Sequence, residues 1–216
     1  MEAVIFDMDG VLIDSHSISS QMLCETANGF GCNLTIDEIK AWGSLSSRQF
    51  WANVKNAYDL SQSLEELIQS YNVDREIEKY KEIGLMPGVK NLLKDIKAEG
   101  IKTAIATSAS RKRMNAVVTI FELSDYFDQY VCDDEVKMSK PDPGIYLLAA
   151  KKLGINPSSC VVIEDSNNGL RSAKFAGMKC IGFKGLPHVN ENLDGADKLI
   201  TEFIQLTVKD IETLCR

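Results

Sequence analysis

Histidine is scarce in this 216-residue sequence, which has two, and none of its six cysteines belongs to a C-x-x-C pair. Zinc sites in proteins use closely spaced sets of these two residue types, so we expect no zinc site. Most of the cysteines lie in apolar segments, without the dense framework of small disulfide-bonded secreted proteins. We therefore expect reduced thiols and a cytoplasmic location.

Two further absences concern partners. Lys and Arg number 24 against 31 for Asp and Glu, which gives a formal net charge of −7. This balance disfavours nucleic acid and anionic membranes as partners, but it is compatible with a locally positive site for a small anion. No stretch approaches ~18 uninterrupted apolar residues, and the first residues lack the basic and apolar regions of a signal peptide, so we expect no membrane association.

Short apolar runs alternate with helical patterns over most of the chain. Six of these runs have the length and apolar character of buried strands. They span residues 3–6, 102–106, 129–132, 160–163, 180–183 and 198–200. Strands that alternate with helices predict an α/β fold with a parallel sheet flanked by helices on both faces.

One long segment, residues 15–84, interrupts this alternation. It shows no convincing strand, and helix signals follow one another, including capping-box patterns that begin at Thr35 and Ser63. Because the segment enters after the first strand and ends before the second, it is predicted to be an insertion. We expect two domains: a core of residues 1–14 and 85–216, and a small all-helical domain of residues 15–84.

Chemically useful side chains follow four of the predicted strands. They are Asp7 and Asp9, Ser108 in the segment 107–110, Lys140, and Glu164 with Asp165. Ligands of open parallel sheets bind beyond the carboxyl ends of the strands, so these residues are expected to converge. Converging carboxylates repel one another unless a cation joins them, and an all-oxygen ligand set favours Mg²⁺. A metal, a lysine and a loop that opens a helix together predict a phosphoryl-binding site.

The segments FDMDGVLIDS, ATSAS, SKPDP and VIEDSNNG, in this order, closely resemble the haloacid dehalogenase superfamily in its β-phosphoglucomutase-like phosphatase branch. The resemblance covers essentially the whole chain. It implies a Rossmann-like core with a small helical cap inserted after the first strand, and catalysis through an aspartyl-phosphate. Dehalogenases of the superfamily lack the second aspartate of the first motif, so Asp9 argues against dehalogenase chemistry.

The resemblance implies roles for the four carboxylates. Asp7 is similar to the nucleophile that accepts the phosphoryl group, and Asp9 to the general acid that protonates the leaving oxygen and later activates water. Mg²⁺ is expected on the Asp7 side chain, the Asp9 backbone carbonyl and Asp165. Glu164 is expected either to bind the metal directly or to lie just behind its ligands.

The remaining implied roles concern the substrate. Ser108 and the Ala109 amide are expected to hold phosphoryl oxygens, and Lys140 to offset the charge between Asp7 and the phosphate. Thr107 is the alternative hydroxyl if the strand ends one residue earlier. Arg48, in the helical segment, is a candidate ligand for the far end of the substrate.

Three functions are compatible with these motifs. Mutases of this branch carry a cap histidine twelve residues past the nucleophile, where this chain has Ser19, and a Ser-Arg loop that Ser47 and Arg48 match; a further cap lysine has no clear counterpart. We therefore prefer a monomeric Mg²⁺-dependent phosphatase of a small phosphorylated metabolite, for instance a sugar phosphate. A β-phosphoglucomutase is the alternative. A catalytically inactive binding protein is disfavoured because every core catalytic position is filled.

Other conspicuous residues are interpreted as structural. The run RKR at 111–113 is typical of a solvated helix face. The aromatic residues Trp42, Phe50 and Trp51 are interpreted as core of the helical segment. His16, close after Asp14 and Ser15, is interpreted as a loop residue, with a position that faces the cleft as the alternative.

Overall fold

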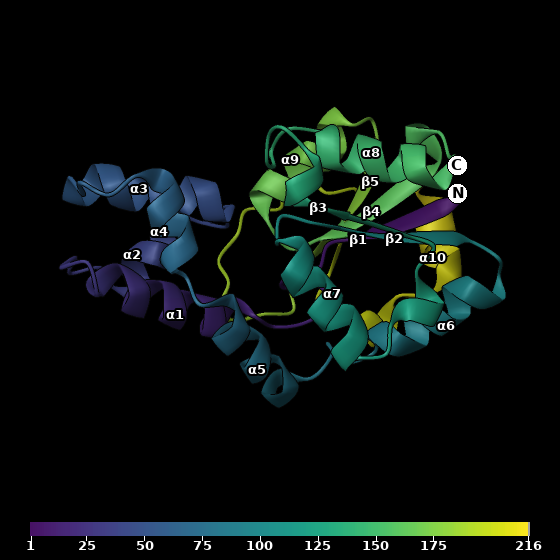
Figure 1. Cartoon of the computed structure of the whole chain (residues 1–216). Helices are drawn as coiled ribbons and strands as arrows, with labels where there is room; N and C mark the ends of the chain where they lie inside the picture. The colour runs from purple at the N-terminus through teal and green to yellow at the C-terminus, as the bar shows by residue number, and fades with distance from the viewer. Residues whose placement is uncertain (216) are drawn as a thin grey trace.

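The computed structural model describes residues 1–215, in which six strands form one parallel sheet in the order β3-β2-β1-β4-β5-β6 (Figure 1). The strands are β1 (Ala3–Phe6), β2 (Lys102–Thr107), β3 (Gln129–Cys132), β4 (Cys160–Glu164), β5 (Lys179–Phe183) and β6 (Lys198–Ile200). The predicted α/β class with a parallel sheet is confirmed. β2 and β4 each end one residue later than predicted, at Thr107 and Glu164.

Helices cover both faces of the sheet, as parallel strands require. One face carries α6 (Val89–Ala98), α7 (Arg111–Ile120) and α10 (Val208–Thr213), and the other carries α8 (Gly144–Leu153) and α9 (Asn167–Phe175). Successive side chains of a strand point to opposite faces. In β1, Val4 and Phe6 therefore pack in the first of these layers, whereas Ala3 and Ile5 pack in the second.

The strand order places a topological switch point at the carboxyl end of β1. Phe6 is in register with Ile105 of β2 on one side and with Ile163 of β4 on the other. The chain leaves β1 between two strands whose connections run in opposite directions, and such a position opens a crevice at the sheet edge. The first residue beyond β1 is Asp7, so this residue emerges in the crevice.

Five helices lie between β1 and α6, within the predicted helical segment. They are α1 (His16–Asn28), α2 (Ile36–Ala41), α3 (Ser47–Tyr58), α4 (Leu64–Ser70) and α5 (Val73–Ile83). Helices α1 to α4 enclose a hydrophobic cluster of their own, in which Phe50 and Trp51 are buried and Trp42 is partly buried. The interpretation of these aromatic residues as core is confirmed. The predicted capping boxes at Thr35 and Ser63 are both present.

Helix α5 packs differently from the other four. Its Tyr80 is fully buried in the core cluster below the sheet, and Ile77 and Ile83 pack against the same cluster. Figure 1 shows α5 between α1 and α7, and it contacts both helices. The end of the helical segment is therefore anchored to the core, close to the carboxyl end of β1.

Two simpler expectations concern thiols and membranes. All six cysteines lie within the described residues, and each is a free thiol there. Of the helices in residues 1–215, none combines the length and the apolar character needed to cross a membrane.

Candidate active site

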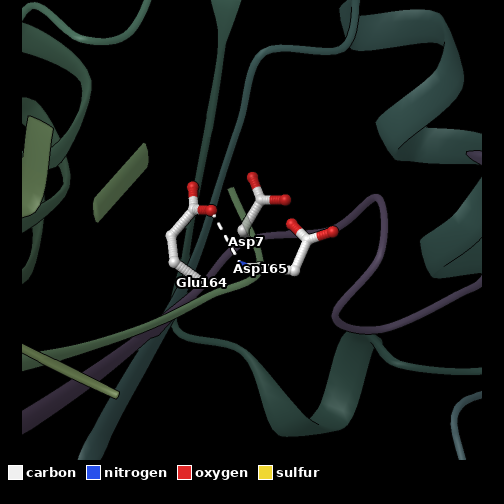
Figure 2. A group of neighbouring side chains, drawn as sticks. All are labelled: Asp7, Glu164 and Asp165. Carbon is white, nitrogen blue, oxygen red and sulfur yellow. Dashed lines mark hydrogen bonds between the residues drawn. The ribbon is translucent and has the colours of Figure 1, made fainter. Parts of the chain in front are cut away.

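Three carboxylates meet at the switch point of the sheet. Asp7 follows β1, Glu164 is the last residue of β4, and Asp165 follows it. Each offers an oxygen, and these oxygens all lie within 4.8 Å of one another (Figure 2). All three side chains are buried. The structure thus brings together three residues that the sequence placed at two separate strand ends.

Lys140 joins this carboxylate cluster from the loop after β3. Its Nζ lies 2.7 Å from Asp7 Oδ1 and 2.7 Å from Glu164 Oε1, and it donates to the Ala106 carbonyl at 3.1 Å. Burial by itself lowers the pKa of a lysine, but the charges of Asp7 and Glu164 more than reverse this and raise the pKa of Lys140. The lysine therefore remains a cation within the cluster.

Glu164 has its acceptor positions largely filled by protein donors. Tyr146 Oη donates to Oε1 at 2.7 Å, and the amides of Asp165 and Ser166 each donate to Oε2 at 3.0 Å. Burial raises the pKa of Glu164, but Lys140 and these hydrogen bonds outweigh it, so the net shift is downward. A Cβ at Gly169 would lie 1.7 Å from Glu164 Oε1, so only glycine fits there. Sequence reasoning missed these supporting residues because none carries a motif by itself.

The cluster has more negative than positive charge. Burial raises the pKa of Asp7 well above its usual value; Lys140 lowers it, while the charges of Glu164 and Asp165 raise it further. One lysine thus compensates three buried carboxylates incompletely. A divalent cation would supply the missing charge, and oxygen donors on a buried site match what Mg²⁺ prefers. The residues present therefore fit a metal ion.

Asp9 lies on the turn that follows Asp7. The Gly10 amide donates to the Ile13 carbonyl at 2.7 Å, and Gly10 has a φ of +82°. A Cβ on Gly10 would come within 1.9 Å of Asp165 Oδ2, so this tight turn requires glycine both for its conformation and for space. The Asp9 side chain accepts hydrogen bonds from the Ser15 hydroxyl and from Arg113 Nη2, the latter at 3.0 Å.

The two candidate hydroxyl groups at the end of β2, those of Thr107 and Ser108, have different surroundings. Thr107 is buried at the end of the strand, and its Oγ1 accepts from the Ala109 amide at 3.0 Å. Ser110 is used as the N-cap of α7. Ser108 lies between them and is only partly buried, and within residues 1–215 its hydroxyl forms no hydrogen bond to another protein group. Ser108 is therefore the hydroxyl of this loop that remains available to a ligand.

Arg48 lies apart from the carboxylate cluster. Its side chain is exposed and pairs with Glu65 at 3.4 Å. It also lines a cavity of about 470 Å³ between the start of α3 and the loop around residues 137–143. In the same region Gln49 Nε2 donates to the Lys140 carbonyl at 3.4 Å. Arg48 thus faces the groove between the helical segment and the core, on the side of the loop that carries Lys140.

Two residues interpreted as structural lie in the site instead. The interpretation of His16 as a loop residue is wrong, because it begins α1 and its Nε2 lies 2.8 Å from Asp165 Oδ2. Burial lowers the pKa of His16, but Asp165 outweighs this and the pKa is raised to about 9. The place of His16 close after Asp14 and Ser15 is compatible with a position that faces the cleft, but it does not indicate Asp165 as the partner.

The interpretation of the run 111–113 as a solvated face is wrong for Arg113. Its side chain is only 18% exposed, and Nη2 lies 3.0 Å from Asp9 Oδ1 and 2.9 Å from Glu76 Oε1. The sequence carries one signal for the burial of Arg113. Val117 is a buried position of α7, and a residue four positions earlier lies on the same side of a helix.

Comparisons with known proteins agree with this geometry. A family model described as haloacid dehalogenase-like hydrolase matches residues 4–183. The phosphorylated carbohydrates phosphatase of Thermotoga maritima is 34% identical over 181 residues, which is 84% of each chain. Hexitol phosphatase B of Escherichia coli is 30% identical over 223 residues, covering 97% of this chain and 96% of the relative. The crystal structure of CbbY from Rhodobacter sphaeroides in complex with phosphate has a TM-score of 0.85 at 28% identity, covering 98% of this chain and 99% of the other.

Proposed function

The chain belongs to the haloacid dehalogenase-like hydrolase family, and on this premise we propose that it is a Mg²⁺-dependent phosphatase of a small phosphorylated carbohydrate. The observation that carries the proposal is the buried contact of Asp7 with Lys140, beside Glu164 and Asp165. A carboxylate held in this way is positioned to accept a phosphoryl group. The names of the relatives support a sugar phosphate or a sugar-alcohol phosphate as the substrate class.

We assign the metal to the cluster at the switch point. The side chains of Asp7 and Asp165 and the backbone carbonyl of Asp9 would hold Mg²⁺, with Glu164 orienting the set through its contacts to Lys140. When bound, Mg²⁺ offsets the charge of the carboxylates and of the phosphate and polarises the phosphoryl oxygens.

The first half-reaction uses Asp7 and Asp9. A carboxylate oxygen of Asp7 forms a bond to phosphorus while the bond from phosphorus to the ester oxygen breaks. Asp9 gives its proton to that leaving oxygen, so the carbohydrate departs as a neutral alcohol. Lys140, at 2.7 Å from Asp7, keeps the nucleophile in place and offsets repulsion from the dianionic phosphate. Ser108 and the Ala109 amide would hold the remaining phosphoryl oxygens, although this amide donates to Thr107 Oγ1 at 3.0 Å in this structure.

The second half-reaction regenerates Asp7. Water attacks phosphorus, and Asp9, now ionised, takes a proton from it. The bond between the Asp7 oxygen and phosphorus breaks, which leaves the carboxylate and inorganic phosphate. The same residue thus acts first as acid and then as base, which the turn through Gly10 allows by keeping Asp9 close to the site.

We further propose that residues 15–84 form a cap that determines specificity, with the chemistry in residues 1–14 and 85–216. The two linkers lie side by side, because Ile13 and Leu85 form a β-bridge and the Met86 amide donates to the Leu12 carbonyl at 2.8 Å. Motion of the cap about these paired linkers would open and close the groove and exclude water.

A phosphatase is favoured over a mutase by the surroundings of Ser19. A mutase must hold a second sugar hydroxyl near the phosphoenzyme, and its branch uses a histidine at this position. Here the Ser19 hydroxyl already donates to Glu76 at 2.6 Å and lies 3.4 Å from Arg113. The serine is therefore engaged with protein groups. The β-phosphoglucomutase alternative retains the match of Ser47 and Arg48 to the mutase loop.

The proposed function is tested by measuring phosphate release from a panel of hexose and hexitol phosphates. We expect release from at least one of them with Mg²⁺ present. β-Glucose 1-phosphate is included and followed for isomerisation. Isomerisation faster than hydrolysis would establish the mutase, and no reaction with any member would favour the inactive binding protein.

Replacement of Asp9 by Asn is expected to slow turnover of an alkyl phosphate by roughly 10²–10⁴-fold, because proton transfer is lost. An aryl phosphate with an acidic phenol needs no proton on its leaving oxygen, so its loss should be clearly smaller. Both rates are measured for both enzymes. Equal losses on the two substrates would contradict the role given to Asp9.

Replacement of Arg48 by Ala is expected to raise the KM of the true substrate roughly tenfold or more, since a hydrogen bond to a charged group is lost. A small aryl phosphate that does not reach the cap should be hardly affected. Glu65→Ala is the matched control, because it removes the ion-pair partner and leaves Arg48 in place. If Glu65→Ala has the same effect, Arg48 acts through that ion pair and not on the substrate.

A further inference from the structure

Arg113 is the centre of a buried polar cluster that none of the roles above requires. Its Nη2 lies 3.0 Å from Asp9 Oδ1 and 2.9 Å from Glu76 Oε1, and its Nε donates to Tyr80 Oη at 2.8 Å. Tyr80 in turn donates to Glu76 at 2.9 Å. Glu76 and Tyr80 are fully buried, and both come from α5. The Arg113 guanidinium, from α7, thus connects Glu76 of α5 to Asp9, the proposed general acid.

The geometry leaves Arg113 little freedom. A guanidinium is planar and its donors point in fixed directions, so contacts at Nε and Nη2 together determine where the group lies. Burial lowers the pKa of Arg113, but Asp9, Tyr80 and Glu76 outweigh it and raise the pKa well above its usual value, so the group stays charged. Glu76 and Tyr80 therefore hold Arg113, and Arg113 together with the Ser15 hydroxyl holds the Asp9 carboxylate.

A purely structural link between α5 and α7 would not need this arrangement. Lys112 and Asp74 already join the same two helices by an ion pair of 2.6 Å on the surface. Surface pairs avoid the cost of removing a guanidinium and two carboxylates from water. The buried ion pair of Arg113 with Glu76 differs from this surface pair because Arg113 also contacts Asp9.

We propose that Arg113 is a positioning residue for Asp9, which it holds in the orientation needed for proton transfer to the leaving oxygen. The inference rests on the proposed function. Arg113 itself neither gives nor takes a proton. Displacement of a catalytic group by about 1 Å can cost on the order of 10²-fold in rate, so loss of one of the two contacts that hold Asp9 should be visible in kcat.

The test compares an alkyl substrate, a hexose 6-phosphate that the wild type hydrolyses, with p-nitrophenyl phosphate, whose leaving group needs no proton. Arg113→Met should lower kcat on the alkyl phosphate by roughly 10–100-fold and on the aryl phosphate by no more than about threefold, with KM little changed. Lys112→Met is the matched control: it removes a charge and an ion pair between the same helices without contact to Asp9. It should leave both rates unchanged.

Arg113→Met leaves Asp9 and Glu76 without a cation, so its melting temperature is recorded alongside. Arg113→Lys keeps the charge but lacks the planar set of N–H donors that reaches Asp9, Glu76 and Tyr80 together. It should show the same substrate dependence with a smaller loss of kcat. In an Asp9→Asn background, Arg113→Lys should cause no further loss on the alkyl phosphate.

Three results would overturn the inference. Equal losses on alkyl and aryl phosphate in Arg113→Lys would assign a merely structural role. A faster alkyl reaction in that variant would mean that Arg113 holds Asp9 away from the leaving oxygen. An additive loss in the Asp9→Asn background would mean that Arg113 acts independently of Asp9. A wild type that hydrolyses p-nitrophenyl phosphate but no alkyl phosphate would instead contradict the proposed function and this inference with it.

Discussion

Asp7→Asn should abolish turnover, with a loss of at least roughly 10⁴-fold on alkyl and aryl phosphates alike. The amide keeps the shape of the side chain but is not a nucleophile, so no phosphoenzyme forms. Both substrates lose their rate because Asp7 forms its bond to phosphorus in the same step in which either leaving group departs. The measurement is phosphate release, with mass spectrometry of the acid-quenched protein to detect the phosphoenzyme in the wild type.

The same variant should be at least as stable as the wild type in the absence of metal. The pKa of Asp7 is raised by burial and by Glu164 and Asp165, so the folded state binds its proton more tightly than the unfolded state does. An acid shifted in this direction stabilises the fold most at low pH, and that contribution falls as the pH rises above the ordinary value of about 4. The neutral amide of Asp7→Asn does not undergo this loss as the pH rises.

Thermal melting near pH 7, in the presence of a chelator, checks the predicted stability of Asp7→Asn. Asp37→Asn, on the exposed first turn of α2, serves as a control for the substitution itself and should change neither turnover nor melting. Retained turnover in Asp7→Asn would identify water or another residue as the phosphoryl acceptor. A lower melting temperature than the wild type would show that Asp7 stabilises the cluster instead.

Removal of divalent metal should stop turnover almost completely. The cluster sets three carboxylates against Lys140 and His16, so without a further cation it keeps an excess of negative charge that repels a phosphate dianion. Excess EDTA should abolish phosphate release, and excess Mg²⁺ should restore it. Full turnover in chelator would contradict the metal assignment.

Metal binding is also expected to stabilise the fold, which gives a readout that does not depend on activity. At a Mg²⁺ concentration about 100 times its Kd, the free energy of unfolding should rise by about 2.7 kcal/mol. Asp165→Asn removes one ligand and should lose most of this gain. An equal rise in both proteins, or an equal rise with NaCl at matched ionic strength, would indicate screening of charge in place of a specific site.

Much of the fold is determined by patterns within short stretches of the sequence. The strands at residues 3–6, 129–132 and 198–200 have the bounds that their apolar runs predict. The helices after Thr35 and Ser63 begin where their capping boxes place them. These features depend on residues within one turn or one strand, so local physics suffices to predict them. The carboxylates that directly follow predicted strands likewise indicate which edge of the sheet carries the candidate site.

Only the tertiary structure decided which of the distant residues touch. Asp9 and Arg113 are 104 positions apart, and His16 and Asp165 are 149 apart. Arg113 and Lys112 are neighbours in one charge run, yet the first is buried against Asp9 and the second pairs with Asp74 at the surface. The physical reason is that α5 packs Tyr80 into the core beside α7, and that packing turns one side of α7 toward the carboxyl end of β1. The spacing of Arg113 from Val117 indicates that this side of α7 is buried. It does not show that Asp9 lies opposite, because that depends on the strand order and on where α5 docks.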